Sequence, residues 1–320
     1  MAIHRFDPVR WHTTFAAHDP VFTLQDGDTL VTHTVDAAGV DATGTRVAPT
    51  PNPLTGPFRI EGARPGDRLR VRIDAVRPDR GYGFARASLA PNVVDPDFVP
   101  ELGYDPRNDG ARFRVSLQDG TATLWRDEGP LAGWTLPLAP MLGCIGVAPA
   151  GGEAISTATS GPHGGNMDVR RLGPGAEVIL PVFEPGALLF VGDAHAAQGD
   201  GEISGTGIEI SAEVHLTVHL DRGGEEVGWP RGRAGGERFT MGNARPLDQA
   251  AQHATTEMVR WLMDDLDLSA ADAGLLMSQT VRYDIGNVFD PAYTVVCRMP
   301  EAVLEALPPQ GGADAVTRSG

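Results

Sequence analysis

The segment that decides the fold class is IEISAEVHLTVHL, residues 208–220, in which apolar and polar side chains alternate throughout. An extended chain points successive side chains to opposite faces, so this run has one apolar face and one polar face. That period of two is typical of a β-strand that packs one side on a core. The 40 glycines and 26 prolines of the chain punctuate other short strands, which favours a β-rich fold.

Before this strand lies EVILPVFEPGALLFV, residues 177–191. Two apolar, β-branched runs flank Glu184-Pro185-Gly186, and adjacent Pro and Gly residues are typical of a turn. The pattern predicts a β-hairpin. A hairpin would bring the residues before its first strand close to the residues after its second strand.

The two runs brought together in this way are HGGNMD, residues 163–168, and GDAHAAQGDGE, residues 192–202. They concentrate carboxylates, imidazoles and glycines. Asp193 and His195 are two residues apart, so in an extended chain both side chains point to the same face. Such a cluster indicates a metal-assisted or acid/base site.

Helices are predicted only late in the chain. One follows Pro246 and carries an apolar stripe, and a second begins at Ser269, where Asp272 completes a capping box. A short third helix begins near Pro300. We expect an N-terminal β domain (1–130), a central β region with the site (131–243), a small α/β part (244–308) and a flexible tail (309–320).

Charge and composition exclude several function classes. The formal net charge of −16 opposes binding to nucleic-acid phosphates and anionic membrane surfaces. All 26 basic residues are arginine, and the absence of lysine excludes Schiff-base, pyridoxal phosphate, Walker-loop and lysine-dependent amidase mechanisms. There is no Gly-x-Ser-x-Gly elbow and no helix-opening GxGxxG motif, which argues against an α/β serine hydrolase and a dinucleotide-binding protein.

The expected location is the cytoplasm. The two cysteines, Cys144 and Cys297, form no CxxC motif and fit an intracellular protein with reduced thiols. The first residues lack the apolar region of a signal peptide, and no apolar run approaches the length of a membrane-spanning helix.

Each candidate residue also has a structural interpretation. Asp193 either caps a turn or binds a metal, Glu209 is either solvated or catalytic, and Asp36 by default belongs to a turn. Glu202 is favoured as the catalytic carboxylate. Cys144 lies in an apolar run and is expected in the core.

Several pieces of the chain resemble the acetamidase/formamidase family. In the order of that family, the matching pieces are NPLTGP (52–57), EGARPGD (61–67), residues 143–149, HGGNMD (163–168), GDAHAAQGDGE (192–202) and VFDP (288–291). The resemblance implies a mainly β enzyme with jelly-roll-like sandwich and β-barrel-like parts and a small α/β part near the C-terminus. It also implies a homo-oligomeric protein with a divalent metal that hydrolyses a short amide to a carboxylate and ammonia.

The residues allow a hypothesis for this chemistry. Without lysine or a serine elbow, the remaining nucleophile is water bound to a divalent ion, with a carboxylate that transfers the proton. We assign His163, Asp193, His195 and Asp36 to the metal, and Glu202, with Glu209 as second choice, to proton transfer. Gly164, Gly165 and Asn166 are assigned to the substrate carbonyl.

Imidazole mixed with hard oxygen ligands favours Zn²⁺, with Ca²⁺ as a second candidate at a carboxylate-only site. Two alternatives stay open. One is a metal-dependent hydrolase of an imide, a lactam or a larger amide. The other is a non-catalytic β module that binds a metal or a ligand.

Overall fold

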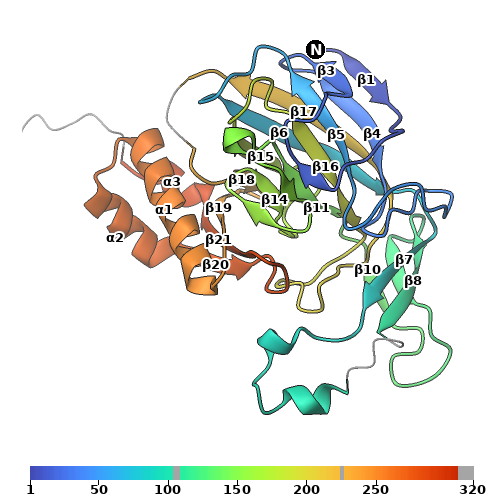
Figure 1. Cartoon of the computed structure of the whole chain (residues 1–320). Helices are drawn as coiled ribbons and strands as arrows, with labels where there is room; N and C mark the ends of the chain where they lie inside the picture. The colour runs from blue at the N-terminus through green and yellow to red at the C-terminus, as the bar shows by residue number, and fades with distance from the viewer. Residues whose placement is uncertain (104–108, 224–226, 309–320) are drawn as a thin grey trace, which may run out of the picture.

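The computed structural model describes residues 1–103, 109–223 and 227–308, and two large sheets form its body (Figure 1). The predicted tail, 309–320, lies outside the described residues. The larger sheet has nine strands, in the order β1 (Ile3–Phe6), β4 (Thr29–Thr34), β17 (Ala212–Asp221), β6 (Arg68–Pro78), β15 (Glu177–Pro181), β18 (Arg231–Ala234), β19 (Glu237–Ala244), β21 (Tyr293–Pro300) and β20 (Arg282–Ile285).

The second sheet has six strands and carries the glycine-rich runs. Its order is β13 (Ser160–Gly161), β14 (Gly164–Asn166), β11 (Met141–Gly146), β16 (Leu189–His195), β5 (Leu54–Ile60) and β3 (Phe22–Leu24). Apolar side chains from both sheets, among them Leu69, Val218, Ile145 and Leu189, form one buried cluster. The two sheets therefore pack as a sandwich, and their alternating strands supply its core.

A four-stranded arm projects from the body (Figure 1). It contains β10 (Thr135–Pro137), β9 (Thr121–Leu124), β8 (Gly110–Ser116) and β7 (Tyr82–Arg86), with two short 3₁₀ helices, Pro91–Val93 and Val99–Leu102, between β7 and β8. A two-stranded ladder, β2 (Thr14–Phe15) with β12 (Ile155–Ser156), and a third 3₁₀ helix, Ala150–Gly152, complete the β-rich part.

Three α-helices lie together at one end of the body: α1 (Leu247–Leu266), α2 (Ala270–Thr280) and α3 (Glu301–Glu305) (Figure 1). The Ser269 side chain caps α2 by accepting from the Asp272 backbone N–H, as the capping pattern predicts. None of the helices in the described ranges is long and apolar enough to span a membrane. The predicted mainly β fold with helices near the C-terminus is confirmed.

Two local predictions were wrong. Residues 177–191 form no hairpin, because β15 pairs with β6 and β18 in the nine-stranded sheet whereas β16 pairs with β11 and β5 in the six-stranded sheet. The apolar runs therefore cross from one layer to the other. The long strand begins at Ala212 instead of Ile208, because Glu209 makes separate bridges to Phe84 and His195. The nine-stranded sheet also combines strands from all three predicted domain ranges.

Candidate active site

Five carboxylates and one imidazole form a buried cluster at one end of the six-stranded sheet. Asp193 and His195 end β16, and Asp168 follows β14. β11 pairs with both strands, so that Cys144 is opposite Gly192 on one side and opposite Asn166 on the other. The two chemically rich runs therefore meet across β11, and not through the predicted hairpin.

Gly143 on β11 allows this close approach. A Cβ at this position would lie 2.6 Å from an oxygen of Asp168 and 2.9 Å from an oxygen of Asp193. Real Cβ atoms do not tolerate such distances, so any larger residue would push the two carboxylates apart. The cluster therefore requires glycine at position 143.

The other carboxylates come from two loops. Glu202 and Glu209 lie between β16 and β17, and Asp290 lies between β20 and β21. Three groups have ligand atoms within 4.8 Å of one another: Asp168, Asp193 and His195; His195, Glu202 and Glu209; and Asp168, Glu202 and Asp290. Each group shares at least one residue with another, so the six side chains form one continuous centre that could hold a metal ion.

His195 is oriented by hydrogen bonds on the side away from the acids. Its Nδ1 lies 2.8 Å from Oε1 of Gln198, and the Gln198 amide donates to the Asp168 carbonyl oxygen at 2.6 Å. This arrangement places the N–H on Nδ1 and leaves Nε2 facing the carboxylates, 3.1 Å from Glu209 Oε1 and 3.5 Å from Asp193 Oδ1. Metal-binding histidines in proteins are typically held in this way.

Three asparagines connect the carboxylates. The Asn52 amide donates to Asn166 Oδ1 at 2.6 Å and to Asp193 Oδ2 at 3.0 Å. Asn166 in turn donates to Asp290 at 2.6 Å and to Asp168 at 3.1 Å, and Asn287 donates to Asp168 at 3.2 Å. This network holds acidic side chains that would otherwise repel one another.

Backbone strain is concentrated in the same place. Seven non-glycine residues have positive φ in the described part of the chain, and four of them belong to this centre: Asn52, Asp168, Asp193 and Glu202. Such conformations cost about 1–3 kcal/mol each and are typical of functional sites.

Burial determines the electrostatics of the cluster. It raises the pKa of Glu209 to about 7 and that of Asp290 to about 6. Burial, together with neighbouring acids, also raises the pKa of Asp168 and Glu202 well above the ordinary range. Burial opposes protonation of His195, but the Glu209 and Asp193 carboxylates raise its pKa well above its usual value. The centre thus favours positive charge.

Unpaired polar atoms support a bound cation. Asp168 Oδ1, Asp193 Oδ1, Glu209 Oε2 and His195 Nε2 are buried, and none makes a well-directed hydrogen bond among the described residues, although Nε2 lies within ion-pair distance of Glu209 and Asp193. No arginine forms an ion pair with any of the five carboxylates within the described ranges. Buried polar atoms in proteins are normally paired, so these ligand atoms fit a divalent ion in both chemistry and arrangement.

Four predicted residues lie elsewhere. His163 is buried and packs against Phe15, with ring centroids 4.9 Å apart, and neither of its nitrogens has a partner in the described structure. Burial lowers its pKa to about 4. Gly164 and Gly165 are paired within the sheet, between β11 and β13. The structure thus brings none of these three residues to the carboxylates.

Asp36, the fourth, serves the fold. One of its oxygens accepts from Arg80 at 2.7 Å, and the other accepts from the backbone N–H groups of Ala38 and Val40. Both members of the ion pair are buried, and loss of one partner from such a pair typically costs about 3–5 kcal/mol. Its ligand atoms are therefore occupied.

A cavity of about 400 Å³ opens onto the cluster. Asn166, Asp193, Glu202, Glu209 and Asp290 line its polar part. Sequence reasoning assigned no role to Asn52, Asn287 or Asp290, although Asn52 and Asp290 lie in the NPLTGP and VFDP pieces of the family resemblance. A smaller hollow, beside Trp11 and His33, lies apart from these residues.

Comparisons with known proteins show which family the chain resembles. The profile of the Acetamidase/Formamidase family matches residues 146–232. A solved acetamidase from Bacillus halodurans is 30% identical, with a TM-score of 0.81 over 96% of this chain and 100% of that chain. A predicted acetamidase/formamidase from Thermoanaerobacter tengcongensis is also 30% identical, with a TM-score of 0.79 over 96% of this chain and 98% of its own.

Curated sequences give a shorter match. The formamidase of Methylophilus methylotrophus is 38% identical over 53% of this chain and 52% of its own length. The chain spans about half the length of the curated relatives it matches. Its likeness to the solved structures covers nearly the whole fold, including both glycine-rich runs, and the chain belongs to the acetamidase/formamidase family.

Proposed function

We propose that this protein hydrolyses short primary amides, formamide and acetamide among them, to a carboxylate and ammonia with the help of a divalent ion. The observation that carries the proposal is the set of buried, unpaired ligand atoms on Asp168, Asp193 and His195, which converge beside the cavity. The names of the related proteins support the reaction class.

Asp168, Asp193 and His195 would hold the ion. The imidazole favours Zn²⁺ in this group, while the all-oxygen group of Asp168, Glu202 and Asp290 fits Ca²⁺. When bound, such an ion lowers the pKa of a coordinated water toward about 7 and polarises the amide carbonyl.

Glu202 is proposed to move the proton, with Glu209 as the second choice. Both carboxylates line the cavity, and burial raises the pKa of each. A carboxyl group whose pKa is raised by burial holds a proton more readily than an ordinary acid, so it can accept one from the attacking water and give it to the departing nitrogen. Asn166 lines the same cavity and is proposed to donate to the carbonyl oxygen, which requires that it give up one of its hydrogen bonds to Asp168 and Asp290.

We also infer that copies of the chain associate. Trp125 and Trp134 are about half exposed on the arm, and large exposed apolar groups are typical of contact surfaces. Light scattering of the purified protein measures the mass directly, and a monomeric mass would contradict this inference.

The test of the function is ammonia release from formamide and acetamide, measured with the bound metal quantified in the same sample. We expect turnover in the metal-containing protein. Bound metal that raises the melting temperature without turnover of either amide would indicate a non-catalytic binding module instead.

A further inference from the structure

We propose that the part of the cavity lined by Phe84 and Phe289 is an acyl-binding site and that the preferred substrates are primary amides with an apolar acyl group larger than acetyl. The inference rests on the proposed function and extends it to the substrate class. The features that carry it are the size of the cavity, the apolar residues among its lining, and the way its aromatic walls are held.

The cavity is larger than the smallest amides need. Its volume of about 400 Å³ corresponds to roughly 13 molecules of liquid water, whereas acetamide occupies about 2–3 such volumes. The volume lies within the range of sites that take ligands of drug size. Even with an ion at the polar end, space remains beyond an acetyl group.

The remaining lining is mainly apolar. Phe84 and Phe289 provide two aromatic walls, and Ala37, Ala38, Pro51 and Ala158 add small apolar surfaces. An amide head placed at the carboxylates would therefore direct its acyl group toward carbon atoms. Burial of apolar surface is the main source of affinity at such a site.

The Phe84 wall is hydrogen-bonded to the segment that carries Glu209. The Phe84 backbone N–H donates to the Glu209 carbonyl oxygen at 3.2 Å, and the Glu209 N–H donates back to Phe84 at 2.8 Å. This pair of bonds sets the distance between the aromatic wall and the polar end. The arm thus contributes a defined surface to the site through β7.

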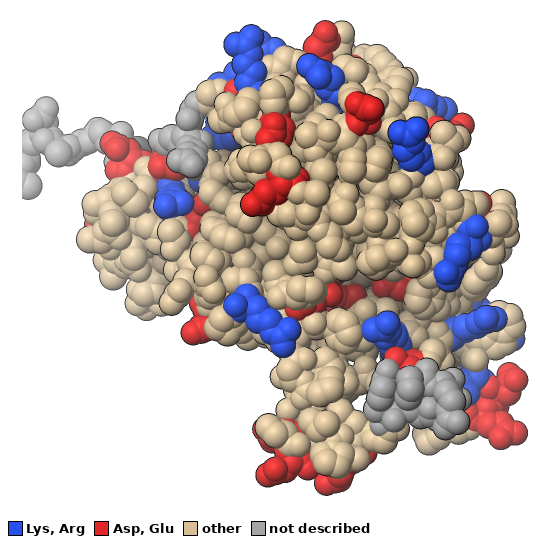
Figure 2. All heavy atoms as spheres, in the orientation of Figure 1, with Lys and Arg blue, Asp and Glu red and all other residues tan. Residues whose placement is uncertain are grey.

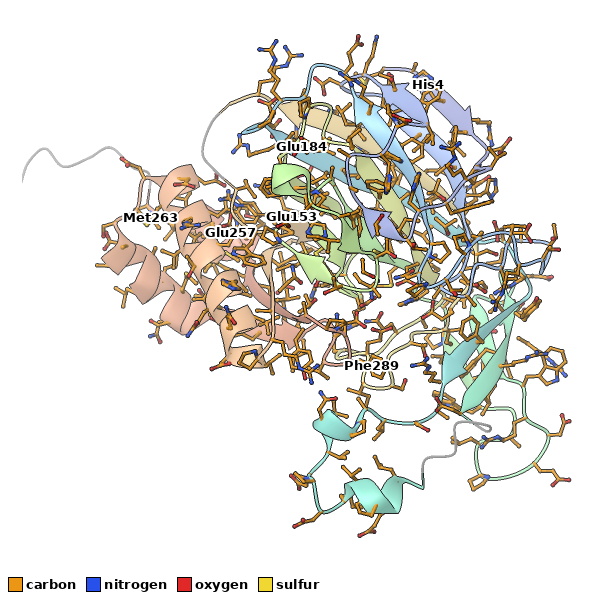
Figure 3. All side chains as sticks on the ribbon, in the orientation of Figure 1. His4, Glu153, Glu184, Glu257, Met263 and Phe289 are labelled. Carbon is orange, nitrogen blue, oxygen red and sulfur yellow. The ribbon has the colours of Figure 1, made fainter. Side chains whose placement is uncertain are left out.

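The Phe289 wall is held from two sides and precedes Asp290 directly. A Cβ on Gly205 would lie 2.5 Å from the Phe289 ring. The backbone at Gly205 therefore packs against the ring in a way that only glycine allows. The Arg86 guanidinium lies 5.7 Å from the ring centroid, and the Arg86 backbone N–H donates to the Thr206 hydroxyl. Figure 3 shows Phe289 where the body meets the arm.

The charges that line the cavity are mixed. Figure 2 shows Asp and Glu atoms in the hollow between the body and the arm. Four carboxylates line the cavity, and Arg86 is the one cationic residue among its described lining. A bound divalent ion would offset the carboxylates at the polar end, and Arg86 lies beside the Phe289 ring, so the apolar lining, and not charge repulsion, favours branched or aromatic acyl groups.

The experiment compares kcat/KM by ammonia release for acetamide, isobutyramide, benzamide and the anion succinamate, with the metal-loaded full chain. We expect isobutyramide or benzamide to exceed acetamide about tenfold or more, which is the scale of one or two methylene groups in an apolar pocket. Succinamate should show no such gain over acetamide, because its acyl chain ends in a carboxylate instead of an apolar group.

Phe289→Ala should lower the ratio of isobutyramide to acetamide about tenfold, mainly through KM, and Phe289→Leu should preserve most of the ratio. Phe98→Ala is the matched control, because Phe98 is 47% exposed on the arm. Calorimetry on Glu202→Gln protein gives a readout without turnover: isobutyramide should bind more tightly than acetamide.

The outcomes separate the two proposals. Hydrolysis of acetamide with slower hydrolysis of every larger amide would overturn the acyl site and leave the proposed function standing. A preference for larger amides that survives Phe289→Ala in a folded variant would overturn the assignment of the wall. No hydrolysis of any amide by the metal-loaded chain would overturn both proposals.

Discussion

The surroundings of His195 and His163 differ although the sequence places both residues in glycine-rich runs beside carboxylates. Both side chains are buried in the same sheet region. His195 faces Asp193 and Glu209, and these charges raise its pKa well above the usual value against the effect of burial. His163 packs against Phe15, and burial alone lowers its pKa to about 4.

The difference shows that the neighbouring side chains, and not the glycine-rich sequence motif, determine the protonation and the role of a buried histidine. An imidazole among acids can serve as a ligand for a cation, whereas an imidazole among apolar groups stays neutral and contributes packing. The comparison yields predictions that separate the two residues.

The largest effect is expected for His195→Ala. The variant should lose bound metal and lower turnover of acetamide by at least about 10³-fold, because an ion of this kind supplies several kcal/mol to the transition state. Metal content and ammonia release are measured on the same preparation. Retention of the full metal content would show that His195 is not a ligand.

Glu202→Gln should lower turnover by about 10²-fold or more while the metal stays bound, since positioned acid/base groups contribute on that scale. Glu209→Gln is the informative companion variant. If it alone loses turnover and keeps its metal, the proton carrier is Glu209.

The smallest effect concerns His163→Gln, which should keep its metal and turnover and change only the pH dependence of stability. The folded pKa of about 4 lies below the ordinary value of 6.5, so the unfolded chain binds the proton more readily. His163 therefore removes stability as the pH falls from 6.5 to 4, by up to about 3 kcal/mol.

In His163→Gln this loss should be absent, so the free energy of unfolding should fall less steeply across the same window. Denaturant unfolding at several pH values measures it. His219→Gln is the matched control because it makes the same substitution on β17 of the nine-stranded sheet, away from the site. An unchanged slope in His163→Gln would contradict the neutral, buried state.

Helices and strands were predicted best where the signal lies in residues that are close together in the sequence. The capped α2 helix and most of the alternating strand at β17 follow from neighbouring residues. The hairpin at 177–191 failed because the choice of partner strand depends on β6 and β11, which are distant in sequence. Local apolar patterns cannot specify that choice.

The site shows the same limit. Asp193, His195, Glu202 and Glu209 were predicted and are brought together by the fold. Asp290 and Asn287 come from a loop about 90 residues further along the chain, and their own residue pattern, apart from the VFDP piece of the family resemblance, does not show which carboxylates they meet. Asp36 was misassigned because its partner Arg80 lies 44 residues away.

The most direct test of the central claim is metal content and ammonia release from acetamide before and after prolonged chelation. The account predicts that removal of the divalent ion abolishes hydrolysis and that Zn²⁺ or a similar ion restores it in proportion to the metal bound. Full hydrolysis by protein shown to be free of metal would contradict the account.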